Sequence, residues 1–224
     1  MRRYLFPLIL GCLGCAILVE LGLWQLRRLE WKTAVLERIE AQMAAQPGHL
    51  PPAAQTSEAA KYQPVRLQGT TGAREIHMLT GVKGEGAGYE IITPFETGGR
   101  TVLLDRGFVA EAAKEAPRPP VQLTVLGTLH WPDEKTSSTP EPDLGRNIWF
   151  ARDVPAMAAA LGTEPVLVVA REVTGEGQGV TPVPVTTLGI PNDHLNYAIT
   201  WFSLAAVWAG MTVYLLWRIR RRTM

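Results

Sequence analysis

LNYAITWFSLAAVWAGMTVYLLW, residues 195–217, is a run of 23 residues without a charged side chain. A second run of the same length, residues 4–26, contains one charge, Glu20. About 20 apolar residues are enough for a helix to cross the hydrocarbon core of a bilayer. Indole side chains favour the membrane interface, and near the ends of the two runs lie Trp24, Trp201 and Trp217. The sequence therefore predicts two transmembrane helices that bracket a central domain.

The first apolar run has two interpretations. MRRY before an apolar stretch resembles a signal peptide, and Cys12 or Cys15 would suit a lipoprotein cleavage site. A signal peptide, however, has an apolar core of only about 7–15 residues, followed by a small-residue cleavage site. Here the apolar residues continue for two turns beyond Cys15. The length favours an uncleaved anchor.

Charge is unevenly divided along the chain. Residues 1–27 carry three Arg and one Glu, residues 28–190 carry 15 basic and 19 acidic residues, and residues 191–224 carry four Arg and one Asp. Basic residues beside a span favour the cytoplasmic side. The N-terminal arginines and the basic tail 218–224 predict two cytoplasmic termini, whereas Arg27, Arg28 and Lys32 oppose this orientation.

We therefore expect a multi-pass protein of a bacterial-type inner membrane. Its parts are an N-terminal transmembrane helix at 1–27, a periplasmic domain at 28–190, a C-terminal transmembrane helix at 191–217 and a cytoplasmic tail. The net charge of +1 gives no electrostatic footprint for nucleic acid.

The central domain has the pattern of a small β protein. A helix is expected from Glu30 to Gln46, ending at Pro47-Gly48, and a Pro/Ala-rich linker follows at 47–60. Short strand patterns then recur: Val65–Gly69, Glu75–Thr80, Tyr89–Phe95, Thr101–Val109, Val121–Leu129, Ile148–Arg152 and Val166–Val173. Thr97-Gly98-Gly99-Arg100 suits a hairpin turn, and Asp153 and Gly162 suit the caps of a helix at 154–161.

We expect an α+β membrane protein whose extracytoplasmic domain is a mostly antiparallel β barrel or sandwich with short helices. Its β core covers about residues 61–173 and needs no disulfide bond, since the only cysteines lie in the first apolar run.

Several motifs have simple structural interpretations. Gly84-x-Gly86-x-Gly88 precedes a strand, whereas a dinucleotide-binding loop precedes a helix, so a hairpin loop is favoured. Cys12-Leu-Gly-Cys15 has the spacing of a redox pair, but within a bilayer helix small residues favour helix packing. His49, His77 and His130 lack the clustered ligand spacing of a zinc site. No triad, nucleophile elbow or kinase motif is present, so we expect no enzyme.

Two polar residues at the apolar runs are candidate functional residues. An ionisable side chain inside a span is costly, so Glu20 either has a function or pairs with Arg27 or Arg28. His194 stands at the mouth of the second run. Helical spacing places one stripe below it, which comprises Tyr197, Trp201, Leu204 and Trp208. Imidazole is an axial ligand of haem iron; the alternative is an interfacial cap above an aromatic belt.

Six segments resemble the surfeit locus protein 1 family, in the same order. They are LGLWQLRRLEWK at 21–32, YQPVRLQG at 62–69, GYEIITPF at 88–95, VLLDRGFV at 102–109, NIWFARDVPAMA at 147–158 and PNDHLNYAITWF at 191–202. The resemblance covers nearly the whole chain. It implies a membrane-bound assembly factor for haem-copper terminal oxidases, with two spans and a large outer domain.

The resemblance also implies a cofactor and partners. Family members bind haem a and help its delivery to oxidase subunit I, so haem a, subunit I, other assembly factors and the lipid bilayer are the expected partners. The family's candidate haem ligand corresponds to His194. Asp193, before it, departs from the family pattern and either lowers haem affinity or hydrogen-bonds the imidazole.

The remaining site residues follow from packing. If the two spans pack together, then one outer-leaflet pocket would hold His194, Glu20, Trp24, Tyr197 and Trp201. Arg27 and Arg28 would meet the haem propionates through charge-assisted hydrogen bonds. Arg106, in the DRGF turn, is expected to support the fold by bonding backbone carbonyls; partner docking is the alternative.

Two further interpretations belong to other classes of protein. One is a membrane scaffold that binds oxidase subunits but no haem, and the other is an unrelated membrane enzyme or sensor.

Overall fold

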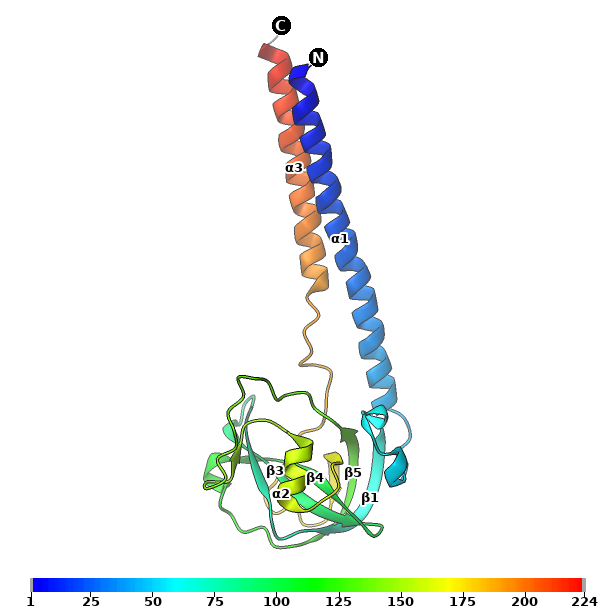
Figure 1. Cartoon of the computed structure of the whole chain (residues 1–224), viewed down its shortest axis with the longest axis vertical. Helices are drawn as coiled ribbons and strands as arrows, with labels where there is room; N and C mark the ends of the chain where they lie inside the picture. The colour runs from blue at the N-terminus through cyan, green and yellow to red at the C-terminus, as the bar shows by residue number, and fades with distance from the viewer. Residues whose placement is uncertain (1, 223–224) are drawn as a thin grey trace. The chain divides into compact units, whose positions relative to one another are not determined.

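The computed structural model of the chain describes residues 2–222. Contacts divide it into two units, one formed by residues 1–38 with 187–224 and the other by residues 39–186. The first unit is a pair of helices, α1 (Arg2–Met43) and α3 (His194–Arg222), which lie side by side (Figure 1). They are antiparallel, because the beginning of α1 contacts the end of α3.

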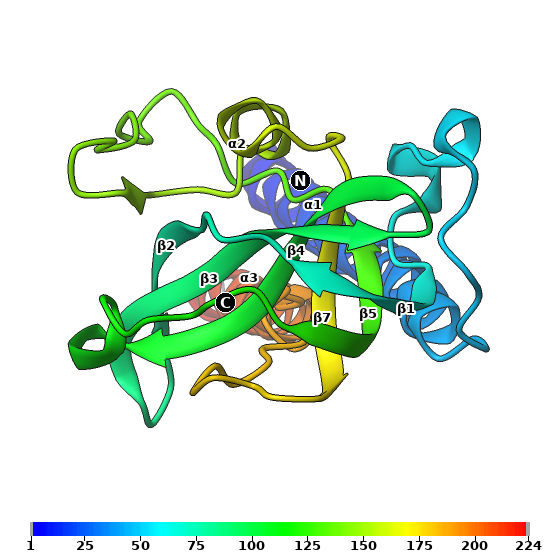
Figure 2. The ribbon, with the colours of Figure 1, turned by 90° about the horizontal axis from the view of Figure 1, so that it is seen from below.

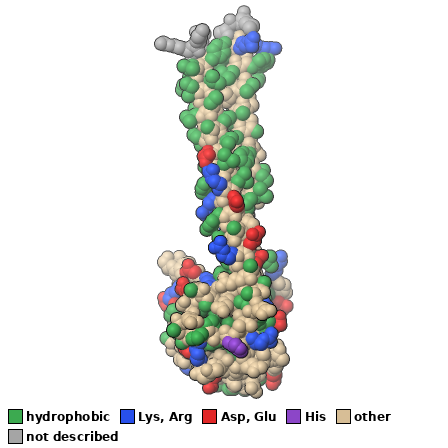
Figure 3. All heavy atoms as spheres, turned by 90° about the vertical axis from the view of Figure 1, so that its right-hand side faces the viewer, with side chains coloured by type: hydrophobic (Ala, Val, Ile, Leu, Met, Phe, Trp, Pro, Cys, Tyr) green, Lys and Arg blue, Asp and Glu red, His purple; other side chains and the backbone are tan. Residues whose placement is uncertain are grey.

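Both helices are long and apolar enough to cross a membrane. Only 11% and 6% of their most apolar windows are buried, so they are not core helices of a globular domain. Hydrophobic side chains cover much of the surface of the helix pair (Figure 3). The expected two apolar terminal helices are therefore confirmed.

Helix α1 is longer than the sequence analysis expects. The apolar run and the polar helix at 30–46 form one continuous element of 42 residues, since no glycine or proline lies between Leu23 and Met43 to interrupt it. It ends at Met43, a few residues before Pro47. Helix α3 likewise continues through the basic tail to Arg222, and Thr223 and Met224 of that tail lie outside the described residues.

The second unit is built on a sheet of seven strands. They are β1 (Pro64–Thr71), β2 (Ile76–Val82), β3 (Gly86–Thr97), β4 (Arg100–Ala110), β5 (Gln122–His130), β6 (Ile148–Trp149) and β7 (Leu167–Thr174). Helix α2 (Val154–Leu161) precedes β7, and three 3-10 turns cover Ala53–Gln55, Glu58–Ala60 and Glu111–Ala113.

Five of these strands close into a barrel, seen end-on in Figure 2. The circuit is β1-β5-β7-β4-β3, and β3 returns to β1. All neighbours are antiparallel except β4 and β7. Taken in chain order, the barrel strands follow the path 1-2-3-5-4-1, which is the strand order of OB-type Greek-key barrels. The fold class is confirmed, with a barrel rather than a sandwich.

Closure of the barrel depends on a short contact between β1 and β3. Only Thr70 with Glu96 and Thr71 with Phe95 pair across this joint. Gly69 allows the approach, because a Cβ there would lie 2.0 Å from the carbonyl oxygen of Glu96.

Apolar side chains fill both faces of the central strands. Leu104 of β4 and Val168 of β7 belong to the barrel interior. Their neighbours Leu103 and Val169 point to the opposite face, where they pack with Met157 of α2. This two-sided burial explains the continuous apolar runs that mark β4 and β7 in the sequence.

The local predictions are largely confirmed. All seven strands are present, with β6 shorter than expected. The turn between β3 and β4 has positive φ at Gly98 and Gly99, as a two-residue hairpin requires. Gly84 lies in the loop that joins β2 to β3, and Gly86 is the first residue of β3. Helix α2 carries the expected cap, since the Asp153 side chain accepts a hydrogen bond from the Ala156 amide.

The DRGF segment, which the sequence analysis places in a turn, lies within strand β4 and contacts residues 177–181. Arg106 is buried and donates to the carbonyl of Gly177 at 3.1 Å and to the side chain of Gln178 at 3.0 Å. Phe108 exchanges two backbone hydrogen bonds with Thr181. The expected structural role of Arg106 is confirmed. Because its side chain is buried, it presents no exposed charge on which a partner could dock.

Replacement of Gly107 should be severely destabilising. Its φ is +116°, and a Cβ would lie 2.1 Å from the carbonyl oxygen of Thr181, so Gly107→Ala combines backbone strain with a backbone clash. We expect a loss of about 3 kcal/mol in the free energy of unfolding, measured by urea denaturation of the outer domain.

Gly98→Ala is the matched control. It also has positive φ, +56°, but nothing lies within 4 Å of the added Cβ, so its cost should be only about 1 kcal/mol. Equal losses in the two variants would contradict the role assigned to the Thr181 contact.

Candidate functional site

Three glycines of α1 lie directly against α3 and form what we call the helix seam. A Cβ added at any of them would clash with one side chain: Gly11 with Thr212 at 2.2 Å, Gly14 with Trp208 at 2.4 Å and Gly22 with Phe202 at 2.7 Å. Trp208 Nε1 also donates to the Gly11 carbonyl at 3.1 Å. Small residues let helix backbones approach closely in lipid. The seam therefore sets the register of the two helices.

At one end of the seam, His194 meets Gln25. His194 Nδ1 lies 2.8 Å from the side-chain oxygen of Gln25. His194 is the first residue of α3 and is half-buried, and Gln25 is only 8% exposed. Since an amide oxygen only accepts hydrogen bonds, this contact is a hydrogen bond when Nδ1 of His194 carries a proton. The sequence analysis does not single out Gln25, although a polar amide inside the apolar run, one residue before its end at Leu26, is a usable signal.

The other predicted site residues differ in exposure. Trp24 and Tyr197 are exposed, with 47% and 56% of their surface accessible, and Trp201 is half-buried. Trp208, from the predicted aromatic stripe, contacts α1 in the seam. Nδ1 of His194 is hydrogen-bonded to Gln25 and not to Asp193. The backbone carbonyl of Asp193 accepts a hydrogen bond from the Tyr197 amide.

Glu20 forms an ion pair with Arg27. Both side chains are more than half exposed, at 65% and 60%. The ion pair is one of the two interpretations that the sequence analysis gives for Glu20. Arg28 lies instead over the ring of Trp31, 4.7 Å from its centroid. A propionate that met Arg27 would compete with Glu20.

The two cysteines are free and differ in environment. Cys12 is exposed on α1, whereas Cys15 is half-buried in the seam and its Sγ lies 3.8 Å from the carbonyl oxygen of Ala205. This placement favours helix packing for Cys15.

The outer domain contains a buried charge cluster that the sequence analysis misses. Arg152 forms an ion pair with Glu134 and lies 3.4 Å from Glu90 and 3.5 Å from Asp105. Asp105 is 1% exposed and Glu90 5%. Asp105 shares its strand face with Leu103, so the cluster lies in the layer that includes α2. Three carboxyl groups thus share one guanidinium.

The cluster shifts the pKa of its members in opposite directions. Burial, with the nearby Glu90, raises the pKa of Asp105 well above its usual value, and burial also raises the pKa of Glu90. Burial opposes the ionisation of Glu134, but hydrogen bonds from Arg152 outweigh it and lower the pKa of Glu134. Asp105 is therefore the member that holds a proton most firmly.

The three histidines of the domain are separate from one another. His49 is exposed, His77 is buried and bonds Glu75 at 2.7 Å, and the ring of His130 lies 5.6 Å from that of Tyr62. Burial lowers the pKa of His130 to about 4. Across residues 2–222, no group of three or more His, Cys, Asp or Glu side chains is placed to hold a metal ion.

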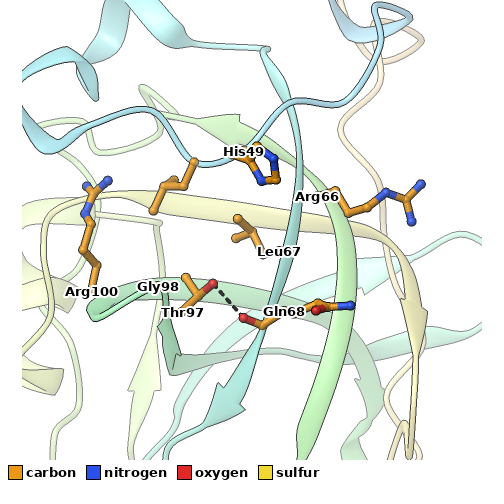
Figure 4. Close-up of a pocket in the computed structure, with 8 residues that line it drawn as sticks. His49, Arg66, Leu67, Gln68, Thr97, Gly98 and Arg100 are labelled. Carbon is orange, nitrogen blue, oxygen red and sulfur yellow. Dashed lines mark hydrogen bonds between the residues drawn. The ribbon is translucent and has the colours of Figure 1, made fainter.

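A cleft of about 480 Å³ opens beside the β1–β3 joint (Figure 4). Thr97 Oγ1 donates to the Gln68 carbonyl at 2.8 Å below it, and the segment that carries His49 lies above it. Of the arginines on its rim, Arg100 is already engaged by Glu164.

The chain has clear relatives among known proteins. The model of the SURF1 family matches residues 12–206. The chain belongs to the SURF1 family.

Individual relatives match over most of their length. The Surfeit locus protein 1 of Xenopus tropicalis is 29% identical over 215 residues, which cover 84% of this chain and 68% of that protein. The human Surfeit locus protein 1 is 28% identical over 210 residues, 83% of this chain and 69% of that protein. The SURF1-like protein of Drosophila melanogaster is 30% identical over 211 residues, with coverages of 83% and 69%.

The first and last SURF1-family segments meet in the structure. Gln25 lies in the segment at 21–32 and His194 in the segment at 191–202, so one hydrogen bond joins segments 169 positions apart. The charge cluster joins three others, since Glu90, Asp105 and Arg152 each lie in a different family segment. Segments that resemble the family thus meet at two places, one in each unit.

Asp105→Asn should alter how stability depends on pH. Because the pKa of Asp105 is raised, its contribution is complete below the ordinary value of 3.8 and is lost as pH rises through the native pKa. Asparagine cannot lose that proton and still accepts the Gly107 amide bond. We expect a variant within about 1 kcal/mol of wild type near pH 4 that becomes relatively more stable as pH rises.

Glu134→Gln is the control of opposite sign. The pKa of Glu134 is lowered, so its contribution is present at neutral pH and is lost on acidification. We expect about 1–2 kcal/mol of destabilisation at pH 7, after allowance for its partial exposure, that disappears near pH 3. Parallel pH profiles for the two variants, from urea denaturation, would contradict the proton assignment.

Proposed function

We propose that this chain is an assembly factor for haem-copper terminal oxidases that binds haem a and aids its insertion into subunit I. Membership of the SURF1 family supports the role in oxidase assembly. Haem binding goes further and depends on one observation, the position of His194 at the start of α3 with its Nδ1 beside the side-chain oxygen of Gln25. Nothing in the proposal requires catalysis.

The residues around His194 suit a haem as cargo. A neutral imidazole binds haem iron through a nitrogen lone pair, and the bond to Gln25 leaves that lone pair on Nε2. Trp24 and Tyr197 present exposed rings at the same end of the helix pair, where they can pack a flat macrocycle. The bound haem would supply the iron that later serves the oxidase, and this chain supplies attachment and release.

Moderate affinity suits a carrier. A single protein ligand, with Arg27 already paired to Glu20, gives a bond that the receiving oxidase subunit can displace. Oxidase subunit I and other assembly factors are the proposed partners of the outer domain.

We also propose that both helices span the inner membrane with both termini in the cytoplasm. The arginines at 218–222 and at the N-terminus support this orientation. Arg221 stacks on Trp217, 4.1 Å from its ring centroid, which places a charged and an aromatic side chain together as expected at an interface.

The orientation predicts the outcome of reporter fusions. A reporter active only in the cytoplasm should be active when fused after Met224 and inactive when inserted at Ser138, because the basic ends stay inside. The reverse pattern would refute the orientation, and an intact mass that lacks the first helix would show a cleaved signal peptide.

The ligand assignment predicts the effect of His194→Ala. Protein purified from cells that make haem a should lose at least about tenfold in haem-to-protein ratio, because the iron bond is removed while the apolar helix remains. Trp201→Ala should lose less, about threefold, since it removes packing only. The measurement is the Soret absorbance of each purified variant.

His49→Ala, His77→Ala and His130→Ala are the controls and should leave the spectrum unchanged. Full occupancy of His194→Ala with an unshifted Soret band would show that another residue is the ligand. A wild-type protein that co-purifies with subunit I but carries no haem would instead support the scaffold alternative.

A further inference from the structure

We propose that Gln25 is a positioning residue that fixes the tautomer of His194, so that Nδ1 carries the ring proton and Nε2 is free to bind iron. The tautomer itself follows from the helix seam; its importance for haem rests on the proposed function.

The first step is the chemistry of the bond. Nδ1 of His194 and the Gln25 side-chain oxygen are 2.8 Å apart. The oxygen has no hydrogen to give, so the bond exists only when Nδ1 is protonated. A neutral imidazole carries one proton, and the bond therefore leaves Nε2 unprotonated.

The second step is the environment of the amide. Gln25 is 8% exposed in a region where α1 and α3 are in contact. A buried amide oxygen that loses its donor pays a desolvation penalty, because no water replaces the imidazole easily. The alternative tautomer is thus disfavoured at this position, whereas an exposed histidine would exchange freely between the two forms.

The third step is what holds Gln25 in place. Gly22, one turn earlier on α1, lets the Phe202 side chain approach, and Ala198, one turn after His194 on α3, is buried at 1% exposure. Two small residues thus bring the backbones together beside the polar pair. The position of the amide depends on the seam and not on a mobile loop.

The consequence for a metal-binding histidine is established chemistry. The partner of the second ring nitrogen orients the ring and raises its basicity, and loss of that partner typically lowers metal affinity by 10–100-fold. Gln25 therefore acts on iron through His194, without touching the haem.

A purely structural role makes a different prediction. Interhelical hydrogen bonds contribute to helix association in membranes, so Gln25 could matter for packing alone. The protonation pattern of the His194 ring separates the two roles, because packing alone would not move it.

The test is nitrogen NMR of the haem-free, full-length protein in lipid nanodiscs, with ¹⁵N in the histidine rings. Spectra are recorded near pH 8.5, about two units above the ordinary imidazole pKa, and the His194 signals are identified by their loss in His194→Ala. We expect a protonated Nδ1 and an unprotonated Nε2 in wild type. Gln25→Leu should populate the Nε2–H form, and Gln25→Glu, which keeps an acceptor, should retain the wild-type pattern.

Gln42→Leu is the matched control. Gln42 lies on the same helix but bonds the backbone carbonyl of Lys61, so its loss should leave the His194 signals unchanged. A wild-type ring protonated at Nε2, or an unchanged ring in Gln25→Leu, would overturn the proposal.

Haem a titration of the same variants gives the second readout. We expect Gln25→Leu to bind about 10–100-fold more weakly and Gln25→Glu to bind near wild type, with a lower reduction potential of the bound haem. Tight binding by Gln25→Leu while His194→Ala loses haem would refute the effect on iron. If His194→Ala also binds normally, the proposed haem function fails, and the tautomer result alone still decides the positioning role.

Discussion

The closeness of two helix backbones is the constraint on which the candidate site depends. In lipid there is no hydrophobic force that drives apolar helices together, so their association relies on packing and hydrogen bonds. Gly11, Gly14 and Gly22 allow that packing, and each faces a larger α3 side chain. The register that results places Gln25 opposite His194. A larger residue at Gly22 would separate the helices beside this pair and leave two polar side chains without partners.

The outer domain contains a cluster of buried charged side chains around Arg152. Removing carboxylates from water is costly, and one guanidinium cannot compensate three of them. The domain accommodates them because the raised pKa of Asp105 favours its uncharged form and Glu134 remains partly exposed. Such clusters seldom add net stability. A fold that separates their members is nevertheless strongly destabilised, because it leaves a buried charge without a partner. In this chain the members come from β3, β4, the loop after β5 and the segment before α2, so the cluster selects the packing of those segments on the barrel.

Much of this structure follows from local patterns, and the remainder depends on contacts between distant residues. Alternation and turn residues located all seven strands, because each strand buries one or two faces whose period is visible in the chain. The cap at Asp153 was equally local. The continuity of α1 was missed, since a change from apolar to charged residues near Arg27 looks like a boundary although nothing there breaks a helix. Gln25 and Arg152 were missed for another reason. Each is an ordinary polar residue in its own segment and gains its meaning only from a partner that is far away in sequence.

The parallel pairing of β4 with β7 has a consequence for synthesis. Strand β7 is inserted between β4 and β5, both of which are made earlier, and its residues 167–170 are all buried. Until Leu167 has left the ribosome, β4 and β5 each present an unpaired edge, and such edges bind other extended chains readily. The barrel can close only when β7, the last strand of the domain, is available. Before β7 pairs, the polypeptide is an open sheet, and this is the stage at which it is most prone to aggregate.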